Sequence, residues 1–332
     1  MVDDGTRWKA GVTAVRYACQ ALLVLLALPA WGAAQAICSD APLAVQVLGS
    51  GGPFAGSRRA SSSYLVWAEG RAIALIDVGG GSFLRFGEAG ASLDDLSVVA
   101  ISHLHPDHVS DLPGLLWLSD SVRERPLVLV GPSAGGVFPD IATFARRLFD
   151  GTDGAFPILS GSVGGPGRGV LLDVREIDVT RSTSTVIDLE SGLELWAIGV
   201  PHASIGVANA TTPSVAYRLR LGDRSVVFSS DQNGSDERFV SFAADADVLV
   251  MHMAVSERNV GEVHARPSVV GRIAQDANVR RLVLSHLIEP PEGLPEPDRF
   301  SGSRLEESVA LVEAAFTGPL DVATDLLCIR VR

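Results

Sequence analysis

The chain has 332 residues, 47% of them apolar, and a formal net charge of -12 at neutral pH. Its length accommodates one large domain or two ordinary ones, with enough apolar residues for a sizeable core. Proteins that grip a nucleic-acid backbone usually present a basic face, so this acidic balance argues against a large polyanionic substrate, although it leaves room for a local basic patch.

Residues 1–36 have the composition of a leader segment. Three cations, Arg7, Lys9 and Arg16, precede an apolar stretch over 18–31, and Ala-Gln-Ala follows at 34–36. This order is typical of a secretory signal peptide with its cleavage site. The apolar stretch is shorter than the ~20 residues of a spanning helix. We therefore expect a soluble product, exported to the periplasm or secreted, with no stable membrane association; an uncleaved anchor and a buried N-terminal helix are the alternatives.

Cysteine usage agrees with export. Of three cysteines, Cys19 would leave with the signal peptide, whereas Cys38 and Cys328 would remain near opposite ends of the mature chain. In an oxidising compartment these two thiols could form a disulfide, provided that their Cα atoms come within ~7 Å. The sequence leaves this pairing open.

From residue 43 onward, short apolar runs alternate with glycines and helical segments. The runs predict strands over 43–48, 63–67, 72–77, 96–102, 193–200, 214–221, 225–230, 248–253 and 281–285. Helices are predicted over 112–119, 140–149, 267–277 and 304–316. Two successive blocks of strands and then helices indicate an α/β domain over 37–332, with two sheets packed face to face and helices outside. Residues 151–169, rich in Gly, Ser and Pro, read as a loop or lid.

A burst of polar side chains follows the apolar run at 96–102. It contains His103, His105, Asp107 and His108, and Pro106 among them favours a loop over a helix. Zinc prefers imidazole nitrogens and carboxylate oxygens in tetrahedral sets, with one position left open in catalytic sites. A catalytic zinc with one open position takes three protein ligands, so four candidate ligands within six residues are too many for a single ion and suit two adjacent ions. Two metals ~3.5–4 Å apart can share one hydroxide as nucleophile.

Further candidate ligands stand where later apolar runs end. His202, Asp231 and His286 each follow such a run within two residues, which repeats the placement of the first cluster. Side chains at strand ends can converge while the sheet fixes their backbone.

The polar burst resembles the His-x-His-x-Asp-His signature of the metallo-β-lactamase superfamily. Within it, the chain is most similar to the ribonuclease Z-like phosphodiesterase branch. The likeness includes Leu-Gly-Ser-Gly-Gly-Pro at 48–53, Ala-Leu-Ile-Asp-Val-Gly at 74–79 and Leu-Pro-Gly-Leu-Leu at 112–116. It continues through Val-Pro-His at 200–202, Ser-Asp at 230–231 and Arg-Leu-Val-Leu-Ser-His-Leu at 281–287. This resemblance implies a four-layer αβ/βα sandwich of two mixed sheets with helices on the outer faces.

The resemblance also implies roles for individual residues. His103, His105 and His202 would bind one Zn²⁺, and Asp107, His108 and His286 the other, with Asp231 bridging them. Asp77 would orient the ligand loop. Asp107 would serve catalysis as well as metal binding, and His264 would protonate the leaving group. The implied activity is that of a metal-dependent hydrolase, most closely a phosphodiesterase, in which a metal-bridging hydroxide is the nucleophile.

Several positions depart from the ribonuclease Z pattern. The stretch 53–61 carries Arg58 and Arg59 but no Lys or Asn, and His-Met-Ala-Val at 252–255 lacks the glutamate of the family's His-Glu-Ala-Thr. The basic tRNA-holding arm of that family is not visible either. These departures, together with the expected export, argue against tRNA and for a small or short phosphodiester or ester as substrate.

Other functions stay open on the same residues. A lactonase, aryl esterase or sulfatase would use the same two metals, and a non-catalytic metal-binding module is an alternative of another class. Mn or Fe could replace Zn, although diiron relatives typically carry glutamate where this chain has His105. His252 could be an outer contact of the site or a buried, hydrogen-bonded residue. Because homodimers are common in the resembling family, a homodimer is a further expectation.

Overall fold

The computed structural model describes residues 38–332 except 56–57, 118–124, 190–191, 204–210 and 260–262. The predicted signal peptide lies outside these ranges and stays a prediction. Within the ranges, no helix is both long enough and apolar enough to cross a bilayer.

The first sheet has seven strands in the order β14-β1-β2-β3-β4-β5-β6. The strands are β1 (Leu43–Gly49), β2 (Ser63–Ala68), β3 (Arg71–Ile76), β4 (Val98–Ala100), β5 (Leu127–Pro132), β6 (Leu172–Ile177) and β14 (Cys328–Arg330). Pairing from β14 to β3 is antiparallel, and pairing from β3 to β6 is parallel. The carboxyl ends of the parallel strands β3 to β6 therefore lie side by side at the same end of the sheet.

The second sheet also has seven strands, in the order β13-β12-β11-β10-β9-β8-β7. They are β7 (Thr185–Asp188), β8 (Leu193–Val200), β9 (Ser214–Leu221), β10 (Arg224–Phe228), β11 (Val248–His252), β12 (Leu282–Ser285) and β13 (Leu320–Val322). Pairing is antiparallel from β7 to β10 and parallel from β10 to β13. Each sheet is thus mixed, as predicted.

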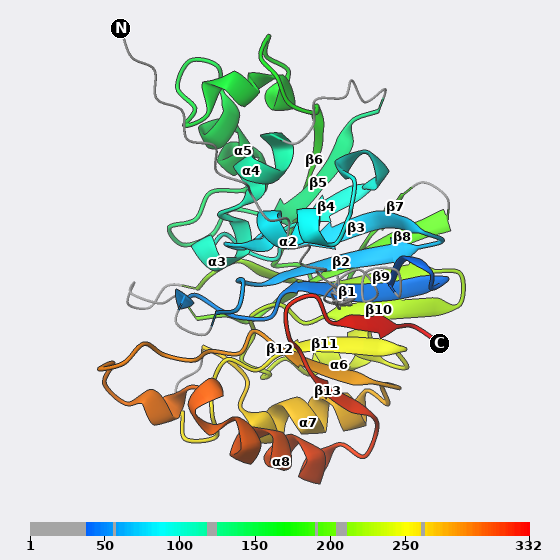
Figure 1. The fold of residues 1–332 in the computed structure, drawn as a ribbon, viewed down its shortest axis with the longest axis vertical. Coiled ribbons are helices and arrows are strands. Elements are labelled where there is room, and N and C mark those ends of the chain that lie inside the picture. The colour runs from blue at the N-terminus through cyan, green and yellow to red at the C-terminus, as the bar shows by residue number, and fades with distance from the viewer. Residues whose placement is uncertain (1–37, 56–57, 118–124, 190–191, 204–210, 260–262) are drawn as a thin grey trace, which may run out of the picture.

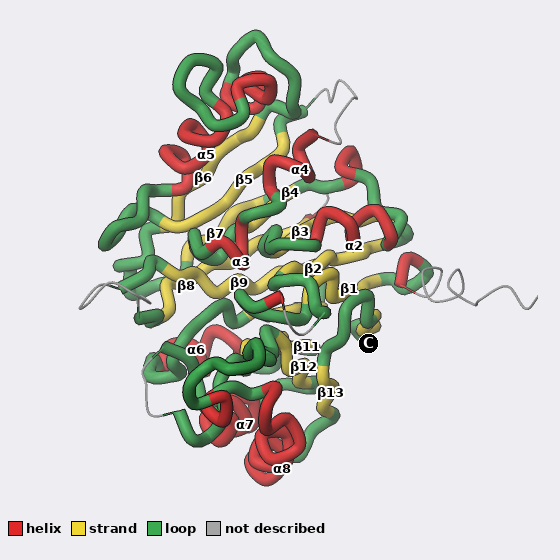
Figure 2. The backbone as a smooth tube through the Cα atoms, turned by 60° about the vertical axis from the view of Figure 1, so that its left-hand side comes forward, coloured by secondary structure: helices red, strands yellow, loops and turns green. Residues whose placement is uncertain are grey.

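Helices cover the outer face of each sheet (Figure 1, Figure 2). The first sheet carries α2 (Ser82–Glu88), α4 (Leu112–Trp117) and α5 (Ile141–Phe149), with the short α3 (Pro106–Val109) at its edge. The second carries α6 (Glu237–Ala243), α7 (Pro267–Asp276) and α8 (Leu305–Ala315). Single-turn 3-10 helices span Leu93–Asp95, Pro297–Arg299 and Gly302–Arg304. This arrangement confirms the predicted four-layer sandwich.

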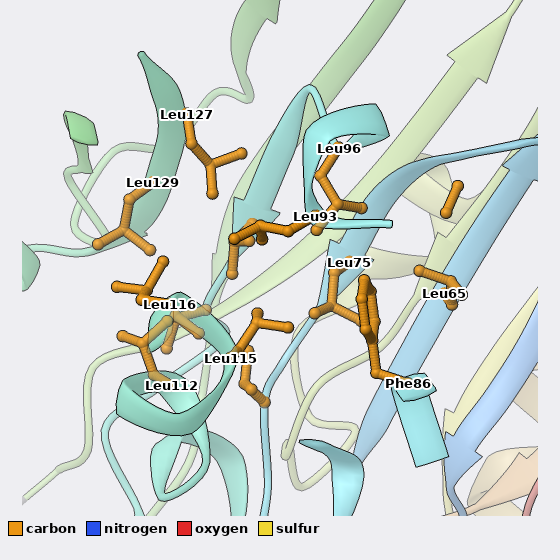
Figure 3. Packing of buried hydrophobic residues seen from close by; sticks show 14 of the residues in the cluster. Leu65, Leu75, Phe86, Leu93, Leu96, Leu112, Leu115, Leu116, Leu127 and Leu129 are labelled. Carbon is orange, nitrogen blue, oxygen red and sulfur yellow. The ribbon is translucent and has the colours of Figure 1, made fainter. Parts of the chain in front are cut away.

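Strand periodicity explains why the layers form. Along β2, Tyr64 and Val66 enter the core between the sheets, whereas Leu65 and Trp67 enter the core beneath the helices. Successive side chains of a strand point to opposite faces, so a strand that is apolar throughout must be covered on both sides. Figure 3 shows the helix side of the first sheet, where Leu115 and Phe86 meet Leu75.

The sequence pattern did not predict the sheet edges. The four edge strands are β6, β14, β7 and β13, and none was predicted; β5 and α6 were missed as well. Edge strands are often short or carry charged residues, so they lack the continuous apolar run by which strands are predicted from a sequence. Here β13 and β14 have three residues each, and β6 includes Arg175 and Glu176.

Two local predictions also needed correction. The segment after β4 is a loop only as far as His105, because Pro106 starts α3, a position where its missing N–H costs nothing. Residues 151–169 contain a 3-10 helix, Pro157–Val163, which buries Leu159 in the first-sheet core beside α5. That segment is a packed part of the domain.

The ends of the described chain are joined. Cys38 and Cys328 form a disulfide, with Cα atoms 5.5 Å apart. Strand β14, which contains Cys328, pairs with β1 and completes that edge of the first sheet. The pairing left open by the sequence is therefore formed.

Candidate metal centre

All seven histidines of the chain gather in one place, beside two buried or half-buried carboxylates. They follow β4, β8 and β12, end β11 or lie in the loop before α7; they are His103, His105, His108, His202, His252, His264 and His286. Asp231, after β10, lies among them. Most of these residues are buried, and such a concentration of imidazoles has no role in packing an apolar core.

Backbone turns of one kind bring the strand ends together. Asp77 after β3, Ser230 after β10 and His286 after β12 all have φ near +57°, at 58°, 56° and 56°. Non-glycine residues rarely adopt this left-handed conformation, and where they do it often belongs to a functional site. Asp77 and His286 are themselves members of the site, and Ser230 directly precedes Asp231, so each of these turns stands at a site residue.

The first candidate metal position combines His103, His105, His202 and Asp231. One ligand atom from each lies within 4.8 Å of the others. His103 Nε2 is 3.0 Å from His105 Nδ1 and 3.6 Å from Asp231 Oδ2, and His202 Nε2 is 3.7 Å from the same oxygen. The four ligands around one zinc ion at ~2.0–2.1 Å lie about 3.4 Å from one another. The donor spacing therefore fits one cation.

The second candidate position combines Asp107, His108 and His286. Asp107 Oδ2 is 3.7 Å from both His108 Nε2 and His286 Nε2. Asp231 Oδ2 lies 3.6 Å from His108 Nε2, and Asp231 Oδ1 lies 3.0 Å from His286 Nε2. Asp231 thus stands between the two groups, at the position that the sequence reading assigned to a bridging ligand.

Neighbouring groups fix which ring nitrogen faces the centre. The Asp77 carboxylate lies 2.7 Å from His108 Nδ1 and also accepts hydrogen bonds from Ser102 N and Ser102 Oγ. His202 Nδ1 is 3.0 Å from the Val263 carbonyl oxygen. Each partner is an acceptor, so each imidazole donates through Nδ1 and turns Nε2 inward.

These inward atoms show that the residues fit metal ions. His108 Nε2 and His202 Nε2 are buried and have no hydrogen-bond partner among the described groups. A buried polar atom without a partner carries a desolvation cost of about 1–3 kcal/mol. One cation at each donor set, coordinated by His202 in the first and by His108 in the second, would remove that cost, and oxygen and imidazole donors suit zinc.

The charge states favour the same conclusion. Burial lowers the pKa of His103 well below its usual value, that of His105 to about 4, and that of His202. Burial alone would raise the pKa of Asp231, but His286, His264 and His108 outweigh it and lower that pKa well below its usual range. Neutral imidazoles around an ionised carboxylate are the state that metal binding requires.

His108 behaves differently. Burial would lower its pKa, but the carboxylates of Asp77, Asp107 and Asp231 together raise it well above its usual value. In the metal-free chain, a proton on His108 compensates these buried acids. Cation binding at Nε2 would release that proton.

His252 belongs to the centre as a carboxylate partner. Its Nδ1 lies 2.7 Å from Asp231 Oδ1 and its Nε2 lies 2.9 Å from Tyr64 Oη, so both ring nitrogens are engaged. Tyr64 Oη is also 2.9 Å from Ser285 Oγ. Burial raises the pKa of Tyr64, which keeps the phenol protonated. His252 therefore orients Asp231, and Tyr64 holds His252.

Sequence reading left His252 ambiguous and missed Tyr64 and Ser285. Tyr64 lies 188 residues from His252 in an apolar strand and gives no local signal. The partners of its hydroxyl group, His252 and Ser285, belong to the other sheet, so the role of Tyr64 is visible only once the two sheets are packed together.

His264 lies at the rim of the same cluster. Its Nε2 is 3.8 Å from Asp231 Oδ2, and its ring packs 5.3 Å from His202 and 5.4 Å from His286. Its Nδ1 is buried and unpartnered among the groups that the structure describes. The side chain adjoins both candidate metal positions without joining either donor set.

The loop between β1 and β2 closes one side of the centre and is fixed by the C-terminal segment. A Cβ on Gly52 would lie 2.5 Å from the His286 ring, so only glycine fits there. Asp325 accepts hydrogen bonds from Ser50 N, Ser50 Oγ and Ala60 N. Arg59 donates to Ser50 Oγ and to the Ala323 carbonyl. Arg59 thus braces the loop and does not project as a substrate contact; Arg58 has a left-handed φ of 57°.

A family model described as a β-lactamase superfamily domain matches residues 74–287, which include every residue of both donor sets. The chain belongs to the β-lactamase superfamily. Its curated relatives include ribonuclease Z of Natronomonas pharaonis, 31% identical over 305 residues that cover 78% of this chain and 94% of the relative. Ribonuclease Z of Mycobacterium sp. strain KMS is 29% identical over 266 residues, covering 74% and 84%. The predicted ribonuclease Z-like branch is confirmed, and the chain is a hydrolase of this branch.

Solved structures agree on the fold. The short form of human tRNase Z superposes with a TM-score of 0.64 at 19% identity, covering 87% of this chain and 99% of that one. The metallo-β-lactamase fold protein YhfI of Bacillus subtilis gives a TM-score of 0.61 at 21% identity, covering 86% and 99%. The metallo-β-lactamase fold predicted from the sequence is therefore confirmed.

Replacing Tyr64 by Phe tests how Asp231 is held. The variant loses one hydroxyl and leaves His252 Nε2 and Ser285 Oγ without their phenol partner. We expect Zn²⁺ affinity, measured by competition with a chromophoric chelator, to fall about 10-fold, because outer contacts typically contribute 10–100-fold. The free energy of unfolding should fall by about 1–3 kcal/mol.

Tyr217→Phe is the matched control. Tyr217 is equally buried in the core between the sheets, and its hydroxyl donates to the Ile101 carbonyl instead of to a residue that holds Asp231. It should lose stability but keep its Zn²⁺ affinity. Equal affinity losses in both variants would assign Tyr64 a general packing role.

Proposed function

We propose that this chain is a dinuclear zinc phosphodiesterase. The observation that carries the proposal is Asp231, whose carboxylate lies within 3.0–3.7 Å of histidine nitrogens from both donor sets. His103, His105 and His202 would hold one ion, and Asp107, His108 and His286 the other. Each ion would have three protein ligands of its own and would share the Asp231 carboxylate, so a reacting group would bind as a fifth ligand, a coordination number that zinc can adopt.

Zinc is the proposed metal because the donors are imidazoles and carboxylates without thiolates. The structural neighbours include a protein described as Zn²⁺-bound PqqB from Methylobacterium extorquens, with a TM-score of 0.58 at 16% identity, which supports the fold alone. Mn or Fe remain the alternatives to be measured.

When bound, the two ions would supply an activated nucleophile and stabilise negative charge on the phosphoryl oxygens. The protein's own residues prepare the place for this chemistry. Asp77 and the Val263 carbonyl hold His108 and His202 in fixed tautomers, and His252 holds Asp231. Asp107, half-buried beside His108 and His286, completes the second donor set.

His264 is proposed to deliver the proton to the leaving alkoxide. It lies beside the bridging carboxylate, and one ring nitrogen makes no hydrogen bond in the described part of the chain. General acid assistance of this kind contributes about 10²–10⁴-fold in rate.

The substrate is proposed to be a short phosphodiester. The expectation against tRNA is weakened by the relatives, several of which are named ribonuclease Z, and by the structural likeness to human tRNase Z. The net charge of -12 still disfavours a large polyanion unless the surface carries a local basic site. A precursor tRNA belongs among the test substrates for this reason.

Asp231→Asn tests the metal centre. We expect bound zinc, measured by mass spectrometry of the metal content, to fall from two ions per chain to one or none. Hydrolysis of bis(p-nitrophenyl) phosphate should fall by roughly 10³-fold or more, since paired metals contribute several kcal/mol to the barrier.

Asp247→Asn provides the control. Asp247 is also buried, but it accepts a hydrogen bond from Ser225 N and pairs with Arg280 at the opposite end of β11. Its variant should keep both ions and full activity. If wild-type protein with two zinc ions cleaves lactones or aryl esters but no phosphodiester, the proposed chemistry is wrong.

His264→Ala tests the proton donor. We expect kcat for a dinucleotide, whose leaving group is an alkoxide, to fall by about 10²–10⁴-fold while two zinc ions stay bound. A much smaller loss is expected for bis(p-nitrophenyl) phosphate, because p-nitrophenolate leaves with little need of protonation. Loss of a zinc ion in this variant would make His264 a ligand instead.

Export is proposed from residues 1–36 and is supported by the Cys38–Cys328 disulfide, since such bonds persist in oxidising compartments. N-terminal sequencing of the protein from its source cell should begin near Ile37, with the disulfide resistant to alkylation. A chain that begins at Met1 and carries two free thiols would contradict both expectations.

A further inference from the structure

A second polar cavity lies on the outer face of the second sheet, away from the metal centre. It has a volume of about 590 Å³ and is lined by residues of β8, β9 and α6 and by serines that precede β7. Strand alternation produces it: Leu195 and Tyr217 enter the core between the sheets, so Trp196 and Arg218 face outward. The residues that line the cavity include three arginines and three serines but no acidic side chain.

Arg218 forms the floor of this cavity. It donates to the carbonyls of Phe242 and Ala244 at the end of α6 and to Ser225 Oγ. All three acceptors are neutral, and Arg218 Nε is buried without a partner in the described chain. Burial, followed by the nearby Arg220, lowers the pKa of this guanidinium. The floor is therefore a cation with neutral hydrogen-bond acceptors, and its charge is compensated only through space by Asp245 and Asp247.

Arg220 and Arg238 form the rim. Arg220 lies 5.7 Å above the Trp196 ring and 3.7 Å from Glu194, and Arg238 pairs with Asp236. Their side chains are 42% and 43% exposed, so both can still reach a ligand. The Arg220–Glu194 pair is exposed and is worth about 0–1 kcal/mol, whereas Arg238 makes a bidentate pair with the mostly buried Asp236, so Arg220 is the more easily recruited of the two.

We propose that this arginine pocket, lined by Arg218, Arg220 and Arg238, binds a phosphate group of a single-stranded oligonucleotide. Arginine presents several N–H groups in a plane that matches phosphate oxygens, and serine hydroxyls can complete the site. The sequence reading allowed for a local basic patch on an acidic protein, and this pocket supplies one. This proposal rests on the proposed phosphodiesterase function, because it names a single-stranded oligonucleotide as the class of substrate.

The position of the pocket suits such a strand. Strands β8 and β9 line both sites: β8 ends two residues before His202, and Ser214 at the start of β9 donates to the Asp231 carbonyl. Ile198, which lines the pocket, is four residues from His202, about 13 Å at ~3.3 Å per residue. Single strands space phosphates ~3.4 Å or more apart, so a strand of several nucleotides spans this distance.

The test uses a labelled eight-residue oligoribonucleotide and Asp231→Asn protein, which is expected not to cleave it. Binding is followed by fluorescence anisotropy over a range of salt concentrations. Arg220→Gln and Arg238→Gln should each weaken binding about 5–10-fold and reduce the slope of log K against log salt by about 0.7, the value of one phosphate contact. Arg272→Gln, an exposed arginine on α7, removes the same charge and should change neither quantity.

Activity in the otherwise wild-type protein gives a second readout. The two pocket variants should lose about 5–10-fold in kcat/KM for the oligoribonucleotide but nothing for bis(p-nitrophenyl) phosphate, which is too small to span both sites. Thermal melting and zinc content should match the parent protein, which excludes misfolding. The binding arm holds even if no phosphodiester is cleaved, so failure of the pocket and failure of the proposed chemistry are distinguishable.

Three results would overturn the proposal. Oligonucleotide binding that is equal in Arg220→Gln, Arg238→Gln and Arg272→Gln would show that the pocket is not used. Equal losses for the oligonucleotide and the small diester would show a structural effect on the metal centre. If inorganic phosphate displaces the oligonucleotide completely and binds the pocket as tightly as the oligonucleotide does, the pocket is a site for free phosphate.

Discussion

The structure depends on keeping one buried carboxylate ionised. Asp231 is almost completely removed from water, and an isolated charge there would be very costly. The chain compensates it with imidazoles from His108, His264 and His286 and with a direct contact from His252. Because His108 and His286 direct Nε2 toward both Asp231 and Asp107, the arrangement that stabilises the carboxylate also prepares one of the two cation positions.

The sheets supply the precision that this cluster needs. Its members come from six segments far apart in sequence, and all but His264 stand at or just after the end of a strand that has a neighbouring strand on both sides. The left-handed residues Asp77, Ser230 and His286 then redirect the chain within a single residue. Strain of this kind is tolerated because the surrounding sheet over-determines the backbone. Flexible loops alone would not hold the nitrogen and oxygen donor atoms of each set at the 3.0–3.7 Å separations that one cation requires.

The sequence was most informative where chemistry and periodicity coincide. The runs before His103, His202, Asp231 and His286 are buried strands, and polar residues that close apolar runs stand out. Tyr64 and Ser285 were missed because their partners lie across the sandwich. Asp111 shows the same limit: it directly precedes α4 in the chain, yet its carboxylate accepts hydrogen bonds from Gly81 N and Phe83 N at the start of α2. Local pattern predicts elements well, but it does not reveal which distant polar atoms will meet.

The three hydrogen bonds from Ser50 and Ala60 to Asp325 have a consequence for the timing of activity. During synthesis the chain emerges from its N-terminus, so residue 325 appears about 275 residues after Ser50. Until it does, the loop that closes one side of the catalytic centre lacks its main restraint, even though both donor sets have already been made. A growing chain would therefore carry every ligand of the centre yet remain incomplete as a catalyst, and the enzyme acquires its finished site only when nearly all of its sequence is in place.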